Sequence, residues 1–111
     1  MLYFIDVEIF RTTLFSKAIK KLGASDAELS ALEAEIVGNP FAGDVIPGLK
    51  GIRKIRFAMS GKGKSGGGRC AYVTLHVEDR TYLLLAYAKS QQADLTQQHR
   101  KALLAILEEI L

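Results

Sequence analysis

The spacing of hydrophobic residues predicts helices in the first third of the chain and at its end. Residues 2–9 are apolar and aromatic, as in a strand. In residues 12–22 the apolar side chains share one helical face and the lysines avoid it. A second helix begins at a capping box, with Ser25 as the N-cap and Glu28 as the third helical residue, and ends in a Gly-Asn-Pro sequence. Residues 96–111 repeat the amphipathic helical pattern.

The middle of the chain has the pattern of a sheet. A loop rich in glycine and proline occupies residues 38–51. Three β-rich segments follow, separated by turns: residues 52–59, 69–77 and 81–88. In the first of them, alternation places Lys54 and Arg56 on the same face. The last, TYLLLAYA, is apolar throughout, which predicts a strand buried on both faces.

The element order strand–helix–helix–strand–strand–strand–helix predicts one α+β domain over residues 1–111. We expect the last three strands to form an antiparallel meander that packs against the helices. The N-terminal strand is expected at one edge of this sheet.

The composition is that of an ordinary globular protein, with 49% hydrophobic and 24% charged residues. A single cysteine, Cys70, excludes an internal disulfide, which fits a reducing cytoplasm. The N-terminus lacks the basic region of a signal peptide, and no segment reaches the roughly 20 apolar residues of a membrane span. We therefore expect a cytoplasmic protein without disulfides.

Charge is distributed unevenly although the net charge is only +3. Residues 45–77 contain seven lysines and arginines and no acidic residue, whereas the rest of the chain has 8 basic and 12 acidic residues. Such a cationic block attracts polyanions. A plain solvated surface is the other interpretation of the same pattern.

Two familiar kinds of site have little support. Gly63-Lys64-Ser65 resembles the end of a phosphate-binding loop, but Ala58 stands where that motif needs glycine, and the segment joins two strands. We interpret it instead as a flexible cationic hairpin. His76, His99 and Cys70 do not stand at metal-ligand spacing, so neither a metal nor another cofactor is expected.

The most informative group of residues combines cations with one tyrosine at the ends of the predicted strands. Its members are Lys54, Arg56, Arg69, Tyr87 and Lys89. In a meander these strand ends converge, so the five side chains are expected to form one site. The hairpin lysines, Lys62 and Lys64, are expected nearby.

These segments resemble the RelE superfamily of toxins. The resemblance lies in Lys54-Ile55-Arg56, in Arg69-Cys70-Ala71-Tyr72 and in Leu84-Leu85-Ala86-Tyr87-Ala88-Lys89. The longer run of GLKGIRKIRFA, GKGKSGGGRCAYV, YLLLAYAKS and DLT resembles the HigB-type branch. It implies a RelE-like fold and ribosome-dependent cleavage of mRNA. It also implies a cognate antitoxin, in HigB-type pairs a helix-turn-helix protein similar to HigA.

The resemblance assigns roles to residues of this chain. Lys54 and Arg56 match the paired cations of the first meander strand, Arg69 matches the cation that opens the next strand, and Lys89 matches the lysine that ends the last one. The best-studied RelE type has an arginine directly after that lysine and a tyrosine farther on. Here Ser90 and approximately Leu95–Thr96 occupy those places, so the resemblance alone does not assign the acid and base, and Tyr87 is the candidate for the missing aromatic stack or phenol.

Metal-free RNA cleavage uses the ribose 2′-OH as an internal nucleophile on the adjacent phosphate. A lysine surrounded by other cations loses its proton more readily, which favours Lys54 as the base. Arg56 and Arg69 suit the phosphate oxygens, and Tyr87 suits base stacking or proton donation. The remaining cations of the block are candidates for contacts with RNA or the ribosome: Lys50, Arg53, Lys62 and Lys64.

Two other functions fit parts of the pattern. ParE-like members of the same superfamily inhibit DNA gyrase, and fold alone does not separate them from nucleases. A non-catalytic nucleic-acid-binding module would need only the cationic block. Its stacking platform is weak here, because Tyr72 is the main aromatic candidate for it.

Overall fold

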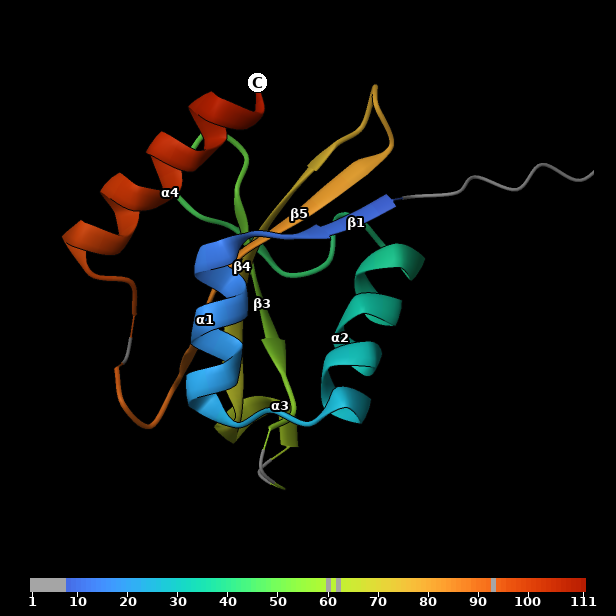
Figure 1. The fold of residues 1–111 in the computed structure, drawn as a ribbon, viewed down its shortest axis with the longest axis vertical. Helices are drawn as coiled ribbons and strands as arrows, with labels where there is room; N and C mark the ends of the chain where they lie inside the picture. The colour runs from blue at the N-terminus through green and yellow to red at the C-terminus, as the bar shows by residue number, and fades with distance from the viewer. Residues whose placement is uncertain (1–7, 60, 62, 93) are drawn as a thin grey trace, which may run out of the picture.

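The computed structural model describes residues 8–59, 61, 63–92 and 94–111, which form a mixed sheet with helices on both faces (Figure 1). The elements are β1 (Glu8–Arg11), α1 (Thr13–Leu22), α2 (Asp26–Gly38), β2 (Asp44–Val45), β3 (Arg53–Phe57), α3 (Gly63–Gly66), β4 (Gly68–Leu75), β5 (Arg80–Ala88) and α4 (Gln97–Ile110). The strand order is β1-β5-β4-β3-β2, with β1 parallel to β5 and the other neighbours antiparallel. The predicted α+β meander with an N-terminal edge strand is confirmed.

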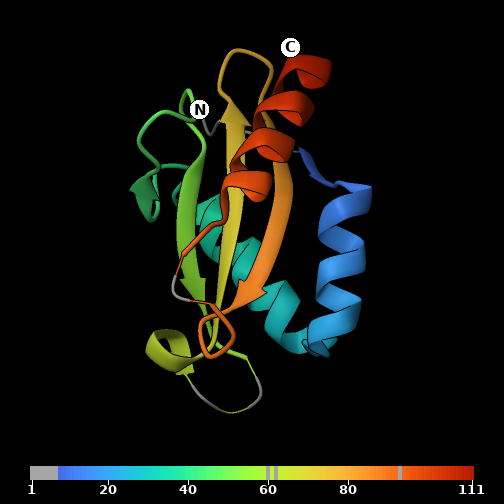
Figure 2. The same ribbon diagram turned by 90° about the vertical axis from the view of Figure 1, so that its left-hand side faces the viewer.

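The two faces of the sheet bury separate apolar clusters. On one face, Phe15 of α1 and Ile36 of α2 pack with Tyr72 of β4 in one cluster. On the other face, Leu103 and Leu107 of α4 pack against β4 and β5. Figure 2 shows α4 in front of the sheet and α2 behind it. Both layers follow from the apolar stripes of the helices, which must be covered to leave water.

Side-chain caps begin each of the three long helices. The capping box predicted at Ser25 and Glu28 is present, with both reciprocal hydrogen bonds. The hydroxyl of Thr12 accepts from the backbone N–H of Phe15 and donates to the carbonyl of Leu84, each at 3.1 Å. Thr12 therefore both starts α1 and attaches it to β5.

A register shift in β5 decides which face each of its later side chains occupies. Tyr72 pairs with Leu83 and Ala71 pairs with Leu85, so Leu84 has no partner on β4. Leu84 and Leu85 both belong to the cluster beneath α4, while Leu83 belongs to the opposite cluster. This is the effect of a bulge, which inserts one residue and reverses the alternation beyond it.

Three sequence predictions differ in detail from the structure. The N-terminal strand was predicted at residues 2–9; residues 1–7 lie outside the described part, and β1 continues to Arg11. The loop at residues 38–51 contains β2, whose two exposed residues are too few to show an alternating pattern. The turn after β3 was predicted to be flexible, but it contains the four-residue helix α3, for which a glycine-rich sequence gives no signal.

Gly43 is a sensitive backbone position. It has a φ of +76°, and a Cβ there would lie 2.3 Å from the carbonyl oxygen of Lys54. We expect Gly43→Ala to lower the free energy of unfolding by about 2–4 kcal/mol, from left-handed strain and a forced backbone shift. Gly38→Ala is the matched control, because nothing lies within 4 Å of its Cβ position. Equal urea midpoints for the two variants would contradict this account.

Candidate active site

Three residues from adjacent strands form a row across the sheet. Arg56 of β3 is directly opposite Arg69 of β4, and Arg69 is directly opposite Tyr87 of β5. Directly opposed residues of antiparallel strands project to the same face. Lys54 lies two residues before Arg56 and therefore shares that face. The structure thus brings four of the five predicted catalytic residues together on the face that carries α4.

The members of this row differ sharply in their exposure to solvent. Arg56 is exposed, whereas Arg69 is only 6% exposed and donates from Nη1 to the carbonyl of Gly68 at 3.0 Å. Burying a guanidinium is costly unless it is hydrogen-bonded. One exposed and one buried cation side by side form a position that attracts an anion.

Tyr87 is buried beside these arginines. Its hydroxyl is the one buried side-chain oxygen or nitrogen in the described residues that has no hydrogen-bond partner. Burial raises the pKa of Tyr87, the charge of Asp94 raises it further, and Arg69 opposes the increase. The phenol is therefore protonated at neutral pH, which suits a proton donor rather than a base.

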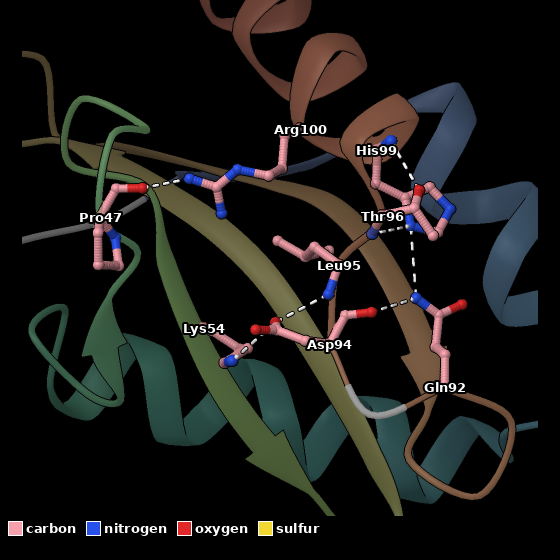
Figure 3. A network of polar contacts seen from close by, with 8 residues as sticks. All are labelled: Pro47, Lys54, Gln92, Asp94, Leu95, Thr96, His99 and Arg100. Atoms are coloured by element: carbon pink, nitrogen blue, oxygen red, sulfur yellow. Dashed lines mark hydrogen bonds and ion pairs between the residues drawn. The ribbon is translucent and has the colours of Figure 1, made fainter.

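Asp94 is a neighbour of the site that the sequence analysis did not single out. Its carboxylate accepts from Nζ of Lys54 at 3.1 Å and from the backbone N–H of Leu95 at 2.8 Å (Figure 3). The hydrogen bond from Leu95, which has the largest effect, and the one from Lys54 hold the pKa of Asp94 below its usual value. Lys54 was expected among cations only, but it forms an ion pair with the carboxylate of Asp94.

Asp94 belongs to a hydrogen-bonded segment that leads from β5 into α4. The amide of Gln92 donates to the carbonyl of Asp94 at 2.8 Å, and the hydroxyl of Thr96 caps α4 by accepting from the N–H of His99 at 3.0 Å. At the other side, the guanidinium of Arg100 donates to the carbonyl of Pro47 (Figure 3). The DLT run that contains Asp94 is only a weak sequence signal for this role.

The other predicted site residues are less closely placed. Lys89 is exposed directly after β5, and Lys50 is exposed in the loop before β3. Arg53 projects to the opposite face from Lys54, where it donates to the carbonyls of Phe41 and Gly43. Lys62 lies outside the described residues, and so does the side chain of Lys64.

The residues considered for metal binding do not meet. His76 stacks on Phe41 with ring centroids 4.7 Å apart. Cys70 is fully buried, which raises the pKa of its thiol. In the described part of the chain no three His, Cys, Asp or Glu side chains are placed to hold a metal ion together. None of its helices combines the length and the apolar character needed to span a membrane.

The sequence also matches a family model. The model describes the RelE toxin of the RelE/RelB toxin–antitoxin system, and the match covers residues 7–111. The chain belongs to the RelE toxin family. This confirms the resemblance at the level of the family, and the mixed sheet with its helices agrees with a RelE-like fold. The RelE-family chain is thus the toxin component of a toxin–antitoxin pair.

The ion pair between Lys54 and Asp94 can be tested by stability. We expect Asp94→Asn to lower the free energy of unfolding by about 0.2–1 kcal/mol near neutral pH, because solvent screens an exposed pair. A lowered pKa makes this contribution complete above the unfolded value of about 3.9. It is lost as the pH falls through the folded-state pKa. Urea unfolding at about pH 7 and about pH 2 should therefore show a difference that disappears at the lower pH.

A double-mutant cycle provides the control for this test. In a Lys54→Met background, Asp94→Asn should cost less at neutral pH, because the ammonium partner is gone. An equal cost in both backgrounds would show that the pair contributes nothing.

Proposed function

We propose that this RelE-family toxin is a ribosome-dependent endoribonuclease that cleaves mRNA without a metal ion. The observation that carries the proposal is the row of Arg56, Arg69 and Tyr87 across three strands, with Lys54 on the same face. Two guanidinium groups and an un-ionised phenol in one row match the charge changes of phosphodiester cleavage. The HigB-like branch, with a helix-turn-helix antitoxin similar to HigA, is part of the proposal.

The reaction divides among these side chains as follows. The ribose 2′-oxygen attacks the adjacent phosphorus, the bond from phosphorus to the 5′-oxygen breaks, and a cyclic phosphate and a free 5′-hydroxyl remain. Arg56 and Arg69 stabilise the negative charge on the phosphorane oxygens. Displaced from Asp94 and next to Arg56, Lys54 releases one proton to solvent, and its neutral amine then accepts the proton of the 2′-OH. Tyr87 donates a proton to the leaving 5′-oxygen. The phenol is suited to this step because its raised pKa keeps the proton in place until the oxygen leaves.

Binding of RNA is expected to break the ion pair between Lys54 and Asp94. In the free protein the carboxylate holds the charged ammonium at 3.1 Å. An RNA strand seated on the row brings its own ribose and phosphate to Lys54, which then exchanges one partner for another. Because Asp94 is 67% exposed, this exchange displaces little buried structure.

Several cations outside the row supply contacts to the RNA backbone or the ribosome in this proposal. Lys50 and Lys89 are exposed, and Lys62 and Lys64 belong in the sequence to the glycine-rich segment between β3 and β4. Arg53 supports the opposite face of β3 through its bonds to two carbonyls, and it is only partly exposed. Such contacts position the protein without reading sequence. We place the toxin in the cytoplasm with its ribosomal substrate.

Removing either arginine of the row tests the proposal. We expect Arg56→Ala and Arg69→Ala each to slow cleavage of mRNA on programmed ribosomes by about 10²–10³-fold, measured by primer extension. Binding to ribosomes should change little. Arg56 is exposed, so its variant should fold even if loss of the buried Arg69 disturbs β4. Lys17→Ala, an exposed cation of α1, is the matched control and should cleave as the wild type does.

Absence of cleavage by the wild-type toxin, together with inhibition of gyrase supercoiling, would replace the proposal with the ParE-like alternative. A wild-type toxin that binds ribosomes without cleaving mRNA or inhibiting gyrase, and whose binding is lost in the Arg56 variant, would instead indicate a binding module without catalysis.

Tyr72 and Tyr87, which are both buried, provide a sharper test. We expect Tyr87→Phe to slow cleavage by about 10²–10⁴-fold through loss of the acid, while removing an unpaired hydroxyl raises the free energy of unfolding by about 1 kcal/mol. Tyr72→Phe should leave the cleavage rate unchanged and lower the free energy of unfolding. The reason is that the Tyr72 hydroxyl lies apart from the row and donates to the carbonyls of Pro40 and Ala42. Cleavage rates and urea unfolding of both variants decide this. A Tyr87→Phe toxin with full activity would exclude the phenol as the acid.

A further inference from the structure

A cavity of about 290 Å³ lies beside the row, at the open edge of β5. Strand β1 pairs with β5 only as far as Leu83, after which Thr12 turns the chain into α1. The next residues of β5, including Tyr87, line the cavity together with α1 and the start of α4. Its volume is near the lower end of the roughly 300–1,000 Å³ typical of small-molecule sites.

The cavity is lined by the polar side chains of Gln92, from the segment before α4, and of His99, in the first turn of α4. Nδ1 of His99 accepts from the backbone N–H of Thr96 at 3.4 Å, so the neutral ring carries its proton on Nε2. The amide nitrogen of Gln92 is directed at the same Nδ1 and at the carbonyl of Asp94, which leaves its amide oxygen as an acceptor. Figure 3 shows that oxygen and Nε2 both turned away from Asp94. His99 and Gln92 thus offer the cavity one donor and one acceptor.

The strand edge adds a second donor and acceptor. The backbone N–H of Lys89 donates to the carbonyl of Gly67, across from β5 to the β4 side. Because backbone groups alternate in an antiparallel ladder, those of Tyr87 also face β4 and those of Ala86 face the open edge. Ala86 lines the cavity. The edge of a planar ligand in this cavity would therefore face the backbone N–H and C=O of Ala86.

The remaining walls suit a flat, uncharged, partly apolar group linked to an anion. Ala18, Leu22 and Leu85 supply apolar surface, and Lys21 supplies one cation. None of the described residues that line the cavity is a carboxylate. A second hollow of about 180 Å³ shares Lys21 and Leu22 with the first and continues toward the glycines before β4. A chain of nucleotides could therefore enter one hollow and continue along the other.

We propose that this cavity binds one nucleobase of the RNA substrate, next to the phosphate held by the row; the inference rests on the proposed function. Nucleobases present adjacent donors and acceptors on a flat ring, which are the groups that His99, Gln92 and Ala86 complement. The position of Tyr87 in both sites fixes the distance between the bound base and the scissile phosphate. The cavity accordingly selects where along an mRNA the toxin cuts.

Direct binding tests the cavity independently of cleavage. The full-length toxin, labelled with ¹⁵N, is titrated with each of the four nucleoside 5′-monophosphates up to about 10 mM, where a Kd of about 1 mM is readily detected. We expect at least one of them to shift the side-chain amide of Gln92 and the ring of His99. Ribose 5-phosphate, which lacks a base, should leave both unchanged.

A pair of glutamine substitutions tests selection of the cleavage position. Gln92→Met keeps the size of the side chain and removes its amide, so we expect about tenfold weaker binding of the preferred nucleotide and an altered distribution of cut positions in mRNA. Gln98→Met, at an exposed position of α4 that does not line the cavity, should match the wild type in both measurements.

Each outcome decides one of the two proposals. Absence of nucleotide-induced shifts at Gln92 and His99, or an unchanged cleavage distribution in an active Gln92→Met toxin, overturns the nucleobase site. A cavity that instead accommodates a side chain of the antitoxin would give the first of these results. Nucleotide-induced shifts in a wild-type toxin that does not cleave mRNA would retain the base site and overturn the nuclease.

Discussion

The structure depends on the pairing of β4 with β5, and above all on the one-residue shift at Leu84. Without that shift, simple alternation would place Tyr87 on the same face as Leu83, beneath α1 and α2. With it, Tyr87 joins Arg69 and Arg56 on the face of α4. Bulges are frequent next to active sites for this reason, since one inserted residue redirects every side chain after it. The hydroxyl of Thr12 accommodates the irregularity by donating to the carbonyl of Leu84.

The row of residues on this face is costly for the folded protein. Arg69 is almost fully buried, and the hydroxyl of Tyr87 has no partner in the described part of the protein. Unsatisfied buried polar groups typically cost about 1–3 kcal/mol, so a fold selected for stability alone would favour phenylalanine at position 87. Two large apolar clusters, one on each face of the sheet, offset that cost. Retaining such a group is consistent with a site in which function is maintained at the expense of stability.

The segment between β5 and α4 connects the two sites that we propose. Asp94 contacts Lys54, which shares the face of the row, while Gln92 and His99, only a few residues away, line the cavity at the edge of β5. The same segment is held by the cap of α4 at Thr96. Asp94, Gln92 and His99 therefore place one short segment in contact with both proposed sites.

The sequence by itself determined the features that depend on near neighbours. Alternation placed Lys54 and Arg56 on one face of a strand, and the capping box at Ser25 located the start of α2. These patterns are local, since a cap or a strand face is set by residues two to four positions apart. The order of the predicted strands grouped Arg69, Tyr87 and Lys89 with this pair, and the family resemblance assigned roles to Arg69 and Lys89.

Only the tertiary structure decided how these parts meet. An apolar run such as TYLLLAYA is compatible with either face for Tyr87, and pairing with β4 resolves the choice. The contact between Lys54 and Asp94 joins residues 40 positions apart, and the cavity is formed by α1, β5 and the start of α4. Register, bulges and cavities arise from packing between distant segments, and no local pattern of residues encodes them.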